Sequence, residues 1–132
     1  MNWKNNKVLI TGGASFIGSH LTEQLIELGA KVRIADNFSS GEKSHVKSLD
    51  CEILEGDLLN PEFCDQATDD IETVFHLAAD HGGRGYIDAH QVECSTNMIL
   101  DGQVFRHAHL NGVEKIIFAS SWAMASRSAW AA

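Results

Sequence analysis

A glycine-rich segment between an apolar run and an amphipathic stretch constrains the fold of this chain more than any other feature. Residues Lys7 to Thr11 predict a β-strand, and Thr11-Gly12-Gly13-Ala14-Ser15-Phe16-Ile17-Gly18 follows at once and opens a predicted helix, Phe16 to Leu28. Gly12 permits a tight turn, and Gly18 lets the helix lie close to the strand. The helix N-terminus offers free N–H groups and a positive dipole end. This arrangement is typical of a turn that binds the pyrophosphate of a dinucleotide.

The rest of the chain alternates short apolar runs with longer amphipathic stretches, which indicates an α/β fold with a Rossmann-type doubly wound parallel sheet. The five expected strands are Lys7–Thr11, Lys31–Ala35, Cys51–Glu55, Thr73–Leu77 and Lys115–Ala119. Further helices are expected over Glu42 to Ser48, Pro61 to about Ala67 and about Val92 to Leu110, with a glycine-rich loop, Asp80 to Gly85, before the last helix.

Apolar stripes predict which face of each long helix meets the sheet. In the first helix the stripe is Ile17, Leu21, Leu25 and Leu28. In the last helix the residues expected to point inward are Ile99, Leu100, Val104 and Ala108.

Asp36 ends the second predicted strand, eighteen residues after Gly18. An acidic side chain at this place accepts hydrogen bonds from the adenosine ribose hydroxyls. Its charge would repel a 2′-phosphate, so we expect the cofactor to be NAD rather than NADP.

Five motifs in order resemble those of the extended short-chain dehydrogenase/reductase family, and within it the NAD-dependent nucleotide-sugar epimerases and dehydratases. Thr11 to Gly18 resembles the family's T-G-x-x-G-x-x-G turn, and Asp36 to Gly41 resembles its D-N-x-S-x-G segment. Gly56-Asp57-Leu58 is similar to the family's G-D-x motif, and His76-Leu77-Ala78-Ala79 is similar to its H-L-A-A motif. Ala119-Ser120-Ser121 is similar to the end of the family's fifth strand.

The resemblance implies the strand order 3-2-1-4-5 and a site for NAD. In it Asp57 contacts adenine, and the H-L-A-A segment lies beside the ribose and the pyrophosphate. The implied cofactor-binding residues are Gly12, Ala14, Ser15, Phe16, Ile17, Gly18, Asp36, Asn37, Asp57, Leu58, Leu77, Ala78 and Ala79.

The sequence departs from the family pattern at two places. Ser15 replaces the middle glycine of the turn. Its Cβ could obstruct the pyrophosphate, and a positive φ at this residue would cost about 1 kcal/mol. Alternatively, its hydroxyl could donate a hydrogen bond to a phosphate. The family's Tyr-x-x-x-Lys pair is absent, because the single tyrosine is Tyr86 and no lysine follows Lys115. Ser121 matches the catalytic Ser/Thr position, but a serine without a base is a weak nucleophile and a poor acid, so a strand-end or capping hydroxyl is the favoured interpretation.

A loop resembles one subgroup of the family. His81-Gly82-Gly83-Arg84-Gly85-Tyr86 is similar to the segment that GDP-mannose 3,5-epimerases place against the sugar, with Gly82, Gly83 and Arg84 as the candidate substrate contacts, and Asn97 matches an asparagine of those enzymes. The alternative is a flexible connection, since glycine-rich loops commonly hold no ligand.

The resemblance also predicts a truncated domain. We expect residues 1–121 to form an incomplete NAD(P)-binding Rossmann domain, without the later strands and the C-terminal domain that binds the nucleotide sugar, and residues 122–132 to be a tail without a family match. The apolar strand Lys115 to Ala119 would then be an exposed edge, and such edges pair with other chains. A homodimer through this edge or through the tail is therefore expected.

Composition excludes several other classes of protein. The formal net charge of -8 disfavours nucleic acid as a partner. No apolar run approaches the roughly 20 residues of a membrane helix. Three scattered cysteines and no apparent signal peptide suggest reduced thiols and a cytoplasmic protein. The histidines show no metal-ligand spacing, so no metal is expected.

Two functions remain open at this stage. One is the NAD-binding part of a nucleotide-sugar epimerase or dehydratase that shows no turnover on its own. The other is a non-catalytic nucleotide-binding or oligomerisation module that uses the same fold.

Overall fold

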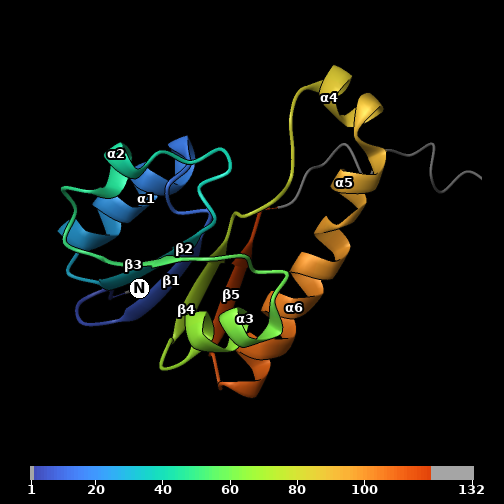
Figure 1. Cartoon of the computed structure of the whole chain (residues 1–132). Coiled ribbons are helices and arrows are strands. Elements are labelled where there is room, and N and C mark those ends of the chain that lie inside the picture. Colours follow the sequence, from blue (N-terminus) through green and yellow to red (C-terminus); the bar gives the residue numbers. More distant parts are fainter. Residues whose placement is uncertain (1, 120–132) are drawn as a thin grey trace, which may run out of the picture.

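The computed structural model describes residues 2–119 and contains one parallel sheet covered by helices on both faces (Figure 1). The strands are β1 (Lys7–Thr11), β2 (Lys31–Asp36), β3 (Glu52–Glu55), β4 (Thr73–His76) and β5 (Lys115–Phe118). Their order is β3-β2-β1-β4-β5, and every neighbouring pair is parallel. The predicted fold class and strand order are therefore confirmed, and each predicted strand matches within one residue at either end.

The helices are α1 (Phe16–Glu27), α2 (Lys43–Val46), α3 (Pro61–Thr68), α4 (Arg84–Ala89), α5 (Gln91–Ser95) and α6 (Asn97–Leu110). One core layer joins α1 and α2 to the sheet through residues such as Leu25, Val46 and Ile10. The other joins α3 and α6 to the opposite face through Ala67, Val104 and Val74. The arrangement in Figure 1 agrees with these two layers.

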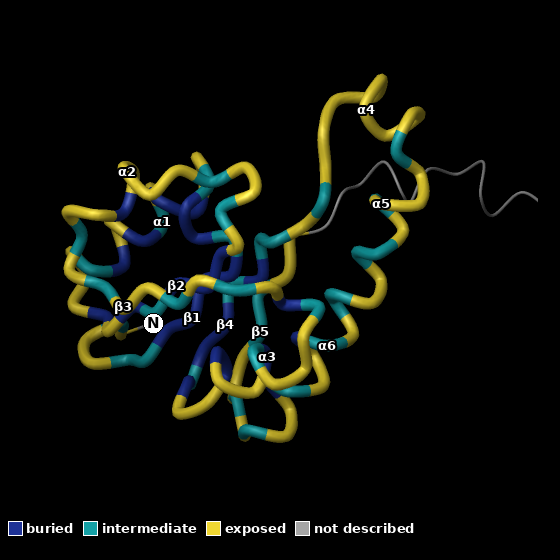
Figure 2. Tube along the Cα trace, viewed as in Figure 1, coloured by how far each residue is buried: buried dark blue, intermediate teal, exposed yellow. Residues whose placement is uncertain are grey.

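The predicted helix from Val92 to Leu110 is helical but not continuous, because it divides into α5 and α6, and α6 begins only at Asn97. A further helix that was not predicted, α4, begins at the end of the expected loop. The interruption lies at Thr96, whose N–H bonds to the carbonyl of Glu93, three residues back, at 3.1 Å. No residue of α4 or α5 is buried, so these helices extend from the sheet without a packed face (Figure 2).

Two predicted helix faces also need correction. In α1 Leu25 is buried and Leu21 packs against the core, as predicted, but Ile17 is 68% exposed and Leu28 58% exposed. The helix meets the sheet through the small residues Gly18 and Thr22 in addition to Leu25. In α6 the buried residues are Val104 and Ala108, as predicted, and Leu100 packs against them, but Ile99 is 59% exposed. The small residues of α1 were missed because the apolar pattern alone gives them no weight.

Candidate dinucleotide-binding site

The carboxyl ends of β1, β2 and β4 bring the sequence motifs together at one edge of the sheet, called here the carboxyl edge. Thr11 at the end of β1 is paired in register with Ala35 of β2 on one side and with His76 of β4 on the other. The chain leaves β1 and β4 toward opposite faces, α1 on one and the α4–α6 segment on the other. Ligands of open α/β sheets bind at such a switch point.

Two glycines shape the turn after β1. Gly12 has φ +69, and a Cβ added to it would lie 3.0 Å from the backbone N of Ala78. A Cβ on Gly18 would lie 2.3 Å from the carbonyl oxygen of Gly12. Backbone therefore approaches backbone at both positions, and this closeness brings the N-terminus of α1 to the carboxyl edge.

Ser15 is the N-cap of α1, a role that sequence reasoning missed. Its backbone is extended, φ -70 and ψ 169, so the side chain causes no left-handed strain at this place. The hydroxyl donates to the carbonyl of Gly12 at 2.7 Å and accepts from the N–H of Gly18 at 3.1 Å. Within residues 2–119, the N–H groups of Phe16 and Ile17 have no acceptor and stay available to an anion.

Asp36 is the last residue of β2 and lies against this turn. One carboxylate oxygen accepts from the N–H of Ala14 at 2.9 Å, and the other accepts from the N–H of Phe38 at 2.8 Å. The residue is buried. A carboxylate has about four acceptor sites, so two are left for further donors such as ribose hydroxyls.

The other predicted adenine-side residues differ in what they present. Asn37 is exposed, and its side chain accepts from the N–H of Ser39 at 3.0 Å. Asp57 is exposed and accepts from the N–H of Leu59 at 2.8 Å. The side chain of Leu58, in contrast, is buried in the core beside α3. Only the backbone of Leu58 can face a ligand.

The segment after β4 is held to the turn by a buried polar network. The hydroxyl of Thr11 accepts from the N–H groups of Leu77 and Ala78, both at 3.1 Å. The same oxygen lies 2.6 Å from Nδ1 of His76, whose Nε2 lies 3.0 Å from a carboxylate oxygen of Asp101 in α6. Burial lowers the pKa of His76, and Asp101 opposes that shift. Leu77 and Ala78 are half-buried and Ala79 is exposed, so this segment borders the turn.

Neither His76 nor Asp101 was singled out from the sequence. His76 belongs to the H-L-A-A motif, for which the sequence predicts only a strand and a wall of the cofactor site. Asp101 is the one charged residue between Met98 and Phe105, and that isolation was the available signal.

The candidate substrate loop forms the start of α4. Gly83 is its N-cap, and the side chain of Arg84 is 94% exposed, with Asp88 3.9 Å away. The hydroxyl of Tyr86 donates to Asp80 at 2.9 Å, and this hydrogen bond raises the pKa of the phenol. Gly82 lies under the Tyr86 ring, since a Cβ there would be 2.6 Å from it.

Asn97 anchors the base of this loop. Its side-chain amide accepts from the N–H of Asp80 at 2.7 Å and donates to the carbonyl of the same residue at 2.8 Å. These two hydrogen bonds to the backbone of Asp80 therefore explain why an asparagine stands at position 97. Ser121, the candidate catalytic serine, lies outside the described residues.

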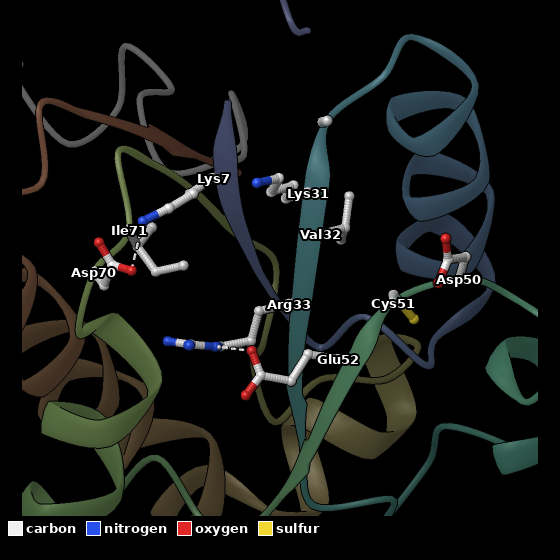
Figure 3. A pocket seen from close by; sticks show the side chains of 10 residues that line it. Lys7, Lys31, Val32, Arg33, Asp50, Cys51, Glu52, Asp70 and Ile71 are labelled. Atoms are coloured by element: carbon white, nitrogen blue, oxygen red, sulfur yellow. Dashed lines mark hydrogen bonds and ion pairs between the residues drawn. The ribbon is translucent and has the colours of Figure 1, made fainter. Parts of the chain in front are cut away.

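A separate hollow of about 380 Å³ lies at the amino ends of β1 and β2, away from the carboxyl edge (Figure 3). Four of its charged side chains form two ion pairs: Lys7 lies 2.5 Å from Asp70, and Arg33 lies 2.7 Å from Glu52. Arg33 also donates to the carbonyl of Asp69 at 2.7 Å. Because Asp69 is the C-cap of α3, the last contact joins the end of that helix to β2.

Residues 2–119 contain neither a metal-binding cluster nor a membrane-spanning helix. No three or more histidine, cysteine or acidic side chains are grouped closely enough to hold a metal ion. No helix in this part of the chain has the length and apolar character to span a membrane.

Comparison with known proteins decides the family. Residues 8–129 match the family described as "NAD dependent epimerase/dehydratase family". The chain belongs to this family. Among relatives of the epimerase/dehydratase family, the UDP-N-acetyl-alpha-D-glucosaminuronate decarboxylase of Bacillus cytotoxicus is 36% identical over 118 residues, which are 87% of this chain and 36% of the relative. The GDP-mannose 3,5-epimerase of Arabidopsis thaliana is 34% identical over 119 residues, 89% of this chain and 31% of the relative.

Solved structures of epimerases agree. An epimerase from Methanothermobacter thermautotrophicus superposes with a TM-score of 0.81 at 33% identity, over 90% of this chain and 36% of the other. The UDP-glucose 4-epimerase of Brucella ovis in complex with NAD gives 0.82 at 29% identity, over 89% of this chain and 36% of the other. This chain thus spans about a third of the length of these proteins.

Proposed function

We propose that the chain binds NAD at the carboxyl edge and is the NAD-binding part of a nucleotide-sugar epimerase or dehydratase. The observation that carries the proposal is the juxtaposition of Asp36 with the turn: its carboxylate bonds to Ala14 beside the free N–H groups of Phe16 and Ile17. A ribose acceptor and a pyrophosphate donor set therefore lie side by side. The bound cofactor would supply hydride transfer, and these residues would bind and orient it.

The residues present fit such a group. Gly12 leaves open a space that a Cβ would fill beside Ala78, and α1 directs its positive end to the same edge. Under this proposal the pyrophosphate is surrounded by Gly12, Ala14, Ser15, Phe16, Ile17 and Gly18. The adenosine lies against Asp36, Asn37, Asp57 and Leu58. The opposite wall of the site is formed by Leu77, Ala78 and Ala79. Residues 1–121 form the domain, and Gly82, Gly83 and Arg84 are left as candidate contacts for a nucleotide sugar.

The choice between NAD and NADP rests on Asp36, and calorimetry with both cofactors tests it. The wild-type chain should bind NAD more tightly than NADP. Asp36→Asn should lose about 1.5–3 kcal/mol of NAD affinity, the value of a charge-assisted hydrogen bond, and should discriminate less between the two cofactors. Asp50→Ala removes the same charge at the far end of the sheet and is the control. Equal NAD affinity in the wild type and Asp36→Asn would refute the role of Asp36.

The 132-residue chain should show no turnover on its own. It has a single tyrosine, Tyr86, whose pKa is raised by the hydrogen bond to Asp80, opposite to the activation that an acid/base phenol needs. A non-catalytic nucleotide-binding module is the second candidate, because the raised pKa of Tyr86 makes that residue a poor acid/base group. Incubation with NAD and UDP- or GDP-sugars separates the two, because epimer formation or cofactor reduction would exclude the module.

Self-association accompanies the proposal. In the described part of the chain β5 is an edge strand, and Phe118 on it is 44% exposed. We propose a dimer built on this edge or on residues 122–132, in the cytoplasm, where the free thiols Cys51, Cys64 and Cys94 would stay reduced. Sedimentation equilibrium at micromolar concentration tests it, and a monomer that is unchanged by deletion of residues 122–132 would exclude it.

A further inference from the structure

The hydroxyl of Thr11 has no free hydrogen-bonding capacity, and this fixes the direction of the buried network. Its oxygen accepts from the N–H groups of Leu77 and Ala78, which use both lone pairs. The hydroxyl proton must therefore point to Nδ1 of His76, 2.6 Å away. Nδ1 is then an acceptor and carries no proton.

The neutral imidazole must in consequence carry its proton on Nε2. That nitrogen lies 3.0 Å from the Asp101 carboxylate, which accepts from it. The His76 side chain is fully buried, and its ring lies against Phe105 at 5.7 Å and Phe118 at 5.6 Å between ring centroids. Apart from the Thr11 hydroxyl, Asp101 is the polar group in contact with this ring in the described residues, so the Nε2–H tautomer is held by Thr11 at Nδ1 and by Asp101 at Nε2.

The network ends on the backbone atom that borders the cofactor turn. The N–H of Leu77 donates both to the Thr11 hydroxyl and to the carbonyl of Thr11, the latter at 3.2 Å. The N–H of Ala78 has only the Thr11 hydroxyl as acceptor within residues 2–119. The same Ala78 N lies 3.0 Å from the place of a Gly12 Cβ. The orientation of the Leu77–Ala78 peptide therefore sets the space above Gly12.

We propose that Asp101, on α6, is a positioning residue that holds His76 in its Nε2–H tautomer and thereby fixes the Ala78 peptide against the dinucleotide turn. Without an acceptor at Asp101, the buried Nε2–H has no partner, and the proton moves to Nδ1. Three donors then compete for two lone pairs of Thr11. The N–H of Leu77 keeps the Thr11 carbonyl as acceptor, whereas the N–H of Ala78, which has no second acceptor in the described residues, must share the hydroxyl oxygen with the imidazole, so its hydrogen bond weakens and the Ala78 peptide shifts. The effect on cofactor affinity rests on the proposed NAD site, but the tautomer does not.

Long-range proton–nitrogen NMR of the imidazole rings tests the tautomer directly, without cofactor. The wild type and Asp101→Asn, which keeps an oxygen acceptor, should show Nε2–H at His76. Asp101→Ala should populate Nδ1–H and shift the amide resonance of Ala78. Gln103→Ala, on the same helix, is the control and should change neither. Nδ1–H in the wild type, or the same behaviour of Asp101→Asn and Asp101→Ala, would overturn the proposal.

Calorimetry with NAD tests the consequence. Asp101→Ala should bind NAD about threefold to tenfold more weakly, the range of one lost hydrogen bond, while Asp101→Asn and Gln103→Ala should bind as the wild type does. Unchanged affinity in Asp101→Ala would refute the link to the cofactor turn. If the wild type itself does not bind NAD, the proposed function fails, and the tautomer measurement still decides the role of Asp101.

Discussion

Replacing Gly18 with alanine should destabilise the chain, although alanine is the better helix former. The added Cβ would lie 2.3 Å from the Gly12 oxygen and 2.8 Å from the Cα of Gly13. Ordinary C···O contacts are about 3.3 Å or longer, so α1 must move away from the turn by about 1 Å. Overpacking against backbone costs about 2–3 kcal/mol, and the gain in helix propensity is about 1 kcal/mol. The expected net loss is therefore about 1–2 kcal/mol.

Gly102 provides a matched control, because it lies in the interior of α6 and a Cβ there meets nothing within 4 Å. Gly102→Ala should stabilise the chain by about 1 kcal/mol. Urea unfolding of the two variants should thus give shifts of opposite sign, with midpoints separated by about 1 M for a slope near 2 kcal/mol per M. If Gly18→Ala is as stable as Gly102→Ala, the close contact between α1 and the turn does not exist as described.

Three further predictions concern single side chains. Ser15→Ala should lower the free energy of unfolding by about 1 kcal/mol, whereas Ser15→Gly should cost only a few tenths, as for other N-caps; equal losses in urea unfolding would contradict the capping role. Burial, with a smaller contribution from Asp57, raises the pKa of Cys64 to about 11, so a disulfide reagent at neutral pH should label Cys64 only after unfolding, and fast labelling of the folded chain would contradict its burial. Because burial lowers the pKa of His76 below 6.5, the unfolded chain binds more protons there; its contribution to stability is complete above pH 6.5 and is lost as the pH falls through the folded-state pKa. In Asp101→Asn the folded-state pKa should fall further, since Asp101 raises it; the loss should then begin at the same pH, continue to lower pH and become larger, and an unchanged pH profile of unfolding would count against the contact.

The sequence was sufficient for the features that depend on local pattern. The strand, turn and helix around Gly12 and the place of Asp36 follow from residue type and spacing, and the strand order followed from the family resemblance. These features agree because turn geometry and apolar alternation both specify the same parallel sheet.

Features that depend on packing or on distant contacts were not predictable in the same way. The exposure of Ile17 results from the close contact of Gly18 with the turn, which the apolar pattern does not contain. Thr96 interrupts the last helix although no proline or glycine marks the place. The contact between His76 and Asp101 joins residues on different elements, and it becomes visible only when β4 and α6 are packed together.

The central claim is that the turn, Asp36 and the segment after β4 form one NAD site, and an NMR titration of the isotope-labelled chain with NAD tests it most directly. The amide resonances of residues 12–18, of Asp36 and of residues 77–79 should shift together and saturate with one affinity. Those of the hollow at the amino ends of the strands, such as Lys31 and Cys51, should stay unchanged (Figure 3). No shifts at saturating NAD, or shifts centred on Lys31 and Cys51, would contradict the account.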